Sequence, residues 1–135
     1  MSTATLRVKT ESPGLLRRAL LADGAVSGAT GLLLALAAGP LGDLLDLSTL
    51  LLRLTGVSLL PYAAALLYVA TREAIDRSAV WVVIGLNLLW AVASIALLLT
   101  GWVEPSGLGY AFVIAQALVV AAFADLQYLG LRRSA

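Results

Sequence analysis

The chain has 135 residues, of which 61% are hydrophobic and 13% charged, and its net charge is +1. Soluble domains usually carry about 25% charged residues, and a soluble fold this small exposes too much surface to hide so many apolar side chains. The composition therefore predicts an integral membrane protein. The net charge of +1 gives no reason to expect a nucleic-acid partner. The sequence has no cysteine and no histidine, which excludes disulfides, thiolate catalysis and His- or Cys-based metal and haem ligation. We therefore expect no cofactor and no enzymatic activity.

The first fourteen residues are polar and end in Pro13-Gly14, a pair that often breaks a helix. We expect residues 1–14 to form a short, mobile cytoplasmic tail and residues 15–135 to form a single transmembrane domain. The first apolar run is followed by Gly39-Pro40 and not by a small-x-small cleavage site, so we expect an uncleaved helix rather than a signal peptide.

The first span is expected at about residues 19–38, because no residue between Asp23 and Asp43 is charged. This run contains three glycines, Gly24, Gly28 and Gly31. The first two form a GxxxG pattern, which lets another helix approach closely. The pattern predicts a packed face, either against a helix of the same chain or across a dimer.

Residues 39–48 read as a turn followed by a short amphipathic piece, with Asp43 and Asp46 facing water and leucines in the interface. The second span is expected at about residues 50–70. It carries Arg53 in its first turn and Pro61 near its middle. A proline there removes one backbone donor, which predicts a packed kink or a moving hinge.

The third span, about residues 78–100, contains the longest uncharged stretch. As a helix, residues 79–100 would extend about 33 Å, enough to cross a hydrocarbon core of about 30 Å. Asn87 is the one amide inside it. The fourth span is expected at about residues 108–129, with Gln116 at mid-depth and Asp125 about one turn before its end.

Short connections between four spans predict an all-α, up-down-up-down transmembrane bundle. Cationic residues fall on one side of it, with Arg53 alone on the other, and the positive-inside rule then places both termini in the cytoplasm. We expect a multi-pass protein of a bacterial inner (plasma) membrane. The residues on the cytoplasmic side are Arg7, Lys9, Arg17, Arg18, Arg72, Arg77, Arg132 and Arg133.

Ionisable groups inside a membrane are functional hypotheses because their burial is costly. For Asp23 and Asp125 the sequence leaves three uses open: pairing with the cytoplasmic arginines, a proton or cation site shared by the first and fourth spans, or a lipid headgroup contact. We expect Asp125 to point into the bundle. Arg53 is expected to form an interfacial ion pair or to bind a lipid phosphate.

The two mid-span amides, Asn87 and Gln116, are expected to form hydrogen bonds between helices. A small polar pocket near Asn87 is an alternative, because Trp90 and Ser94 follow it on the same helical face.

Several stretches resemble small four-helix bacterial membrane proteins of unassigned function. These are residues 51–70 with Gly56 and Pro61, residues 80–99 with Asn87 and Trp90, and the runs GYAFVIAQAL and ADLQYLGLRR. The segment LRLTGVSLLP and the chain length are also loosely similar to DoxX-like four-helix proteins. The resemblance implies a four-helix fold and assigns a role to no residue.

We therefore expect a non-enzymatic membrane protein that acts through helix–helix contact, as a homo-oligomer or as an accessory subunit of a larger membrane complex, with membrane lipids around it. The alternative is a small oligomeric transporter or channel for a proton, an ion or a small solute, with Asp23, Arg53 and Asp125 along its path.

Overall fold

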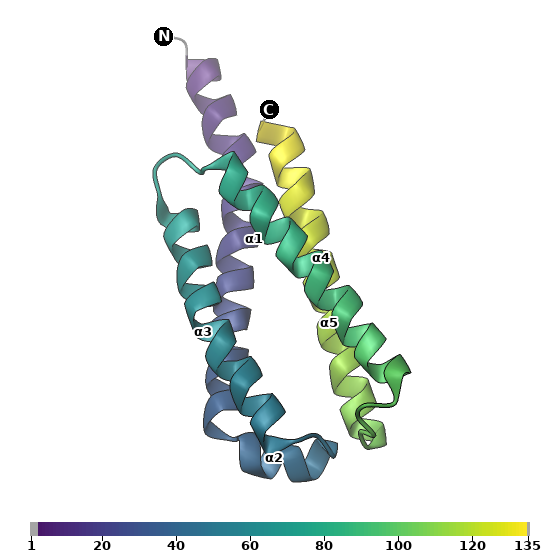
Figure 1. Ribbon diagram of the computed structural model, residues 1–135. Helices are drawn as coiled ribbons and strands as arrows, with labels where there is room; N and C mark the ends of the chain where they lie inside the picture. The colour runs from purple at the N-terminus through teal and green to yellow at the C-terminus, as the bar shows by residue number, and fades with distance from the viewer. Residues whose placement is uncertain (1–2, 135) are drawn as a thin grey trace.

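The computed structural model describes the backbone of residues 3–134 and the side chains of residues 14–133. Over this range the chain is helical, with short connections between its elements. Four helices contain segments long and apolar enough to cross a membrane: residues 14–36, 49–71, 77–100 and 107–133. The helices are α1 (Thr3–Leu36), α2 (Ala38–Leu45), α3 (Thr49–Thr71), α4 (Arg77–Thr100) and α5 (Gly107–Ser134) (Figure 1).

Helix α1 begins earlier than the sequence suggested. It is continuous from Thr3 and passes through Pro13 and Gly14, where the sequence suggested a break. A proline removes one hydrogen bond and can bend a helix, but it does not oblige the helix to end. Asp23 follows Arg17 by six residues, or about 9 Å along the helix. Because Arg17 contacts carbonyls at the end of α3, Asp23 lies between one and two turns inside the level of the α3–α4 loop.

The connections between the spans have clear local causes. Helix α2 is the expected amphipathic piece, with Leu45 buried and Asp43 exposed. It ends at Asp46, whose left-handed φ of 54° closes the last turn. The Ser48 side chain caps α3 by accepting a hydrogen bond from the Leu51 amide (3.2 Å). At the other turn α4 ends at Gly101, whose φ of 78° suits a residue without a side chain.

The four spans pack in the order α3–α1–α5–α4, so that α1 and α5 are the central pair. Helices α3 and α4 make little direct backbone contact, and they diverge toward the end that carries α2 (Figure 1). We call this end the α2 end. The opposite end, which carries both chain termini and the α3–α4 loop, is called the terminal end (Figure 1).

The glycine face of α1 is occupied by α3. A Cβ at Gly24 would lie 2.8 Å from Leu67 Cδ2, and one at Gly31 would lie 2.9 Å from the Gly56 carbonyl oxygen. Gly28 faces Ala63 at an ordinary contact distance of 3.5 Å. The prediction that these glycines face another helix is confirmed, and that helix belongs to the same chain.

Two apolar clusters close the two ends of the bundle. The cluster at the terminal end joins all four spans and includes Leu16, Leu66, Ile84 and Leu131. The cluster at the α2 end joins α1, α2, α3 and α5, with Val113 contributed by α5. Ser106 adds polar ties there, because its amide donates to the Leu45 carbonyl (3.0 Å) and its hydroxyl to the Leu44 carbonyl (3.0 Å). Between these clusters lies the part of the bundle that concerns function.

Candidate intramembrane binding site

A buried polar network is centred on the carboxylate of Asp23. Asn87 Nδ2 and Gln127 Nε2 donate to Asp23 Oδ2 over 2.9 Å and 2.7 Å. The Ser27 hydroxyl, one turn further along α1, donates to Oδ1 over 3.1 Å. Helices α4 and α5 thus supply amide donors to the same carboxylate oxygen of α1.

Asn87 extends this network to the remaining span. Its Nδ2 also donates to Gln127 Oε1 (3.1 Å), and its Oδ1 accepts a hydrogen bond from the Tyr62 hydroxyl (2.8 Å). Asp23, Asn87 and Gln127 expose only 2%, 3% and 0% of their surface. Because Asp23, Tyr62, Asn87 and Gln127 come from four different helices, the network fixes the position of every span relative to the others.

The network contains no cationic side chain. Pairing with an arginine of the terminal end, one of the three uses that the sequence left open for Asp23, is not formed among residues 14–133. Arg17 instead donates to the carbonyls of Ala70, Arg72 (2.7 Å) and Glu73 (3.2 Å) at the end of α3. Arg77 donates to the Leu131 carbonyl (3.2 Å) near the end of α5. Carbonyls at helix C-termini lack helical partners and carry partial negative charge, so they attract guanidinium groups.

Asp125 does not point into the bundle, so the prediction made for it is wrong. Its side chain is exposed, and it has no ion-pair partner among residues 14–133. The reason is helical geometry: Ala124 and Gln127 hold the inward face of α5, and Asp125 is rotated by about 100° from one and about 200° from the other.

Arg53 lies far from the network. It is exposed in the first turns of α3, near the α2 end. The interfacial ion pair expected for it is not formed with any described carboxylate, since Asp43, Asp46 and Glu104 are exposed and Arg53 has no partner among residues 14–133. The structure therefore brings Asp23 and Asn87 together and leaves Arg53 and Asp125 outside.

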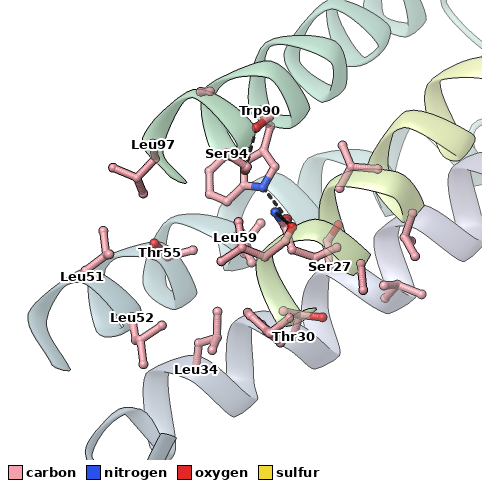
Figure 2. A pocket seen from close by; sticks show the side chains of 18 of the residues that line it. Ser27, Thr30, Leu34, Leu51, Leu52, Thr55, Leu59, Trp90, Ser94 and Leu97 are labelled. Atoms are coloured by element: carbon pink, nitrogen blue, oxygen red, sulfur yellow. Dashed lines mark hydrogen bonds between the residues drawn. The ribbon is translucent and has the colours of Figure 1, made fainter. Parts of the chain in front are cut away.

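A cavity of about 560 Å³ lies between the α1–α3 pair and the α4–α5 pair, and Asp23 forms part of its wall. Most of the lining is apolar, with leucines of α1 and α3 facing alanines, valines and phenylalanines of α4 and α5. Polar groups are spaced along it. They are Ser27, Thr30, Thr55, Ser94 and Gln116. Figure 2 shows Ser27, Thr30, Thr55 and Ser94 around this space, with Trp90 across from Leu59.

Gln116 makes the interhelical hydrogen bond expected of it. Its Oε1 accepts from Trp90 Nε1 over 2.8 Å, and its Nε2 donates to the Val113 carbonyl over 2.9 Å. Ser94 donates to the Trp90 carbonyl (2.7 Å), which leaves its hydroxyl oxygen free to accept (Figure 2). These bonds hold the Trp90 indole in one orientation at the cavity wall, so the cavity has a defined shape on the α4 side.

Tyr62, Gln127 and Ser27 are the site residues that the sequence analysis missed. A signal for Gln127 was present, because it lies eleven residues after Gln116 and eleven residues make about three turns. The two glutamines therefore share one face of α5. Ser27 follows Asp23 by four residues, which places both on one face of α1. No comparable signal singled out Tyr62 among the interfacial aromatic residues.

The buried carboxylate held by neutral donors and the cavity beside it make this region the candidate functional site. No family model, curated protein or solved structure matches the chain.

Proposed function

We propose that the protein is a membrane-embedded carrier that takes up a small, mostly apolar molecule from the bilayer. The observation that carries this proposal is the cavity of about 560 Å³ with Asp23 on its wall. Ligand sites of this kind are typically concave, largely apolar and marked by a few polar groups that fix the ligand's orientation. No catalytic chemistry is part of the proposal.

The divergence of α3 and α4 supports entry from the side. These two helices make little backbone contact and separate toward the α2 end (Figure 1), while α1 and α5 pack together behind the cavity. The cavity wall on the α3 and α4 sides includes Leu59 and Leu97. A molecule dissolved in lipid would enter along this mostly apolar path.

The proposal includes the up-down-up-down arrangement, with both termini in the cytoplasm of a cell whose inner membrane holds the protein. The gathering of Arg17, Arg72, Arg77, Arg132 and Arg133 near the terminal end supports this orientation, because cytoplasmic loops carry an excess of cations.

A role through helix–helix contact, as a homo-oligomer or accessory subunit, is the second candidate. One observation favours it: Gly85 is exposed in the middle of α4, and a Cβ there would meet nothing within 4 Å. The glycines of α1 are already in contact with α3, so a partner helix would use α4 instead. The mass of the protein isolated in a mild detergent tests this candidate.

Fluorescence of Trp90 tests the carrier proposal. Replacing Trp81 and Trp102 by Phe leaves Trp90 as the single tryptophan. We expect a brominated biphenyl, added to this variant in lipid nanodiscs, to quench Trp90 in a saturable way. Ala93→Phe, which fills part of the cavity wall, should abolish saturation, whereas Ala96→Phe, on the same helix but outside the lining, should not. Equal, linear quenching in all three variants would show simple partition into lipid and contradict the proposal.

A further inference from the structure

We infer that the ligand is a lipophilic monovalent cation, such as a substituted ammonium or phosphonium ion, whose charge pairs with the Asp23 carboxylate. This inference rests on the proposed carrier function and names the class of molecule that the same cavity takes. It starts from the charge of Asp23, which the rest of the site does not neutralise.

The groups around Asp23 are polar but uncharged. Ser27 of α1, Asn87 of α4 and Gln127 of α5 bond to its oxygens, and Tyr62 of α3 reaches the network through Asn87. Tyr62 is the one other titratable side chain among them. The charged side chains described on these four helices lie elsewhere: Arg17 and Arg77 bond to backbone carbonyls, and Arg18, Arg53, Arg72, Asp125, Arg132 and Arg133 are exposed.

An ionised carboxylate buried in an apolar bundle is costly unless an opposite charge compensates it. No cationic side chain among residues 14–133 bonds to Asp23, so a bound cation supplies the compensating charge. The three hydrogen bonds to Asp23 leave acceptor capacity on Oδ1, since an ionised carboxylate offers about four lone-pair positions. Asp23 is part of the cavity wall, so a cation in the cavity can approach it.

The aromatic lining favours a bulky organic cation over a hydrated inorganic one. Trp90, Phe112 and Phe123 all border the cavity. Aromatic faces attract cations, and the attraction grows when both groups are desolvated. The indole N–H of Trp90 is taken by Gln116, so it is not available as a donor to a ligand. The site therefore suits a cation with an apolar surface, because it combines a carboxylate, aromatic rings and a largely apolar wall.

The experiment compares three probes of one shape on the full chain in nanodiscs: tetraphenylphosphonium, neutral tetraphenylsilane and the anion tetraphenylborate. Binding is followed by quenching of Trp90 in the Trp81→Phe, Trp102→Phe background and by equilibrium dialysis. We expect the cation to bind more tightly than either the neutral probe or the anion. Asp23→Asn should weaken cation binding by about thirtyfold or more, as removal of one partner of a desolvated charge pair does.

Asp125→Asn is the matched control, because it makes the same chemical change on an exposed residue outside the cavity lining. It should leave cation binding unchanged. Asp23→Glu keeps the charge and should retain binding, which covers the case in which Asp23→Asn does not fold. The probe comparison itself needs no variant of Asp23.

Equal affinity for the cation and the neutral probe, or cation binding unaffected by Asp23→Asn, would overturn the inference. In that case saturable quenching by brominated biphenyl would still support a carrier of neutral molecules. Failure of every probe to bind would instead overturn the carrier proposal itself, so the two failures are distinguishable.

Discussion

Asp23 and Asn87 lie 64 residues apart in the chain and are joined by a hydrogen bond of 2.9 Å. Helices α1 and α4 otherwise make little direct backbone contact, because α5 lies between them in the packing order. The bond therefore crosses the bundle, and it holds the two helix pairs together at the depth where the cavity begins.

Loss of the Asn87 amide should destabilise the bundle. Asn87→Leu removes two hydrogen-bond donations and one acceptance from buried groups, and we expect it to cost about 2 kcal/mol, since a buried polar atom left without a partner costs about 1–3 kcal/mol. Gln116→Leu is the control, because it loses one interhelical bond at a less buried position and should cost only about 0.6 kcal/mol. Unfolding by sodium dodecyl sulfate in mixed micelles measures both. Equal stability of the two variants would contradict the central role of the network.

Two glycines should respond in opposite directions to the same substitution. A Cβ at Gly56 would lie 2.7 Å from the Gly31 carbonyl oxygen, so Gly56→Ala must separate α1 from α3 and should cost about 1–3 kcal/mol. Gly85→Ala meets no atom within 4 Å and should stabilise α4 by about 0.5–1 kcal/mol through helix propensity alone. The same unfolding titration reports both signs. Destabilisation by Gly85→Ala would reveal a partner on that face.

Arg17 should protect the end of α3. It donates to three carbonyls of residues 70–73, so we expect Arg17→Ala to loosen the last turn by about 1 kcal/mol and to speed amide hydrogen exchange there about fivefold. Arg18→Ala, one residue along and exposed, should leave that exchange rate unchanged. Unaltered protection of residues 68–73 in Arg17→Ala would show that α3 does not need this cap.

The helices and their membrane character could be predicted from the sequence, because long uncharged runs dominate it. The hydrogen-bond partners of Asp23 could not be predicted. Arg17 and Arg18 are near it in the sequence, yet Arg17 bonds to carbonyls of α3, and the amide donors to Asp23 come from Asn87 and Gln127, far along the chain. The direction in which the Asp125 side chain points depends on which face of α5 is buried. Because α5 has apolar residues on all of its faces, the sequence does not show which face packs against the other helices.

The exposed position of Asp125 changes the expected effect of replacing it, because the sequence suggested a side chain that points into the bundle. An acidic side chain facing lipid within a span is unfavourable by about 2.5–3.5 kcal/mol near the bilayer centre and by less toward the interface. Asp125→Leu should therefore raise the stability of the isolated protein. A marked loss of stability, or loss of a copurifying protein, would show that another polypeptide covers this face.

The orientation of the chain can be tested with single cysteines, since the sequence has none of its own. Cysteines placed at Asp43, Glu73 and Glu104 occupy the connections on the two sides of the bundle. With both termini in the cytoplasm, a membrane-impermeant maleimide added to intact cells should label positions 43 and 104 and spare 73. The reverse pattern would invert the proposed orientation, and cell lysis provides the control for accessibility.

The hydrogen bonds from Ser106 to the carbonyls of Leu44 and Leu45 bear on whether the protein lets ions leak across the membrane. They fasten the α4–α5 turn to α2 at one end of the bundle, while the apolar cluster of all four spans fills the other end. The carrier proposal therefore predicts that the cavity opens toward lipid and forms no continuous path for water. Vesicles that contain the protein should therefore retain an imposed ion gradient while the cavity loads and unloads its cargo.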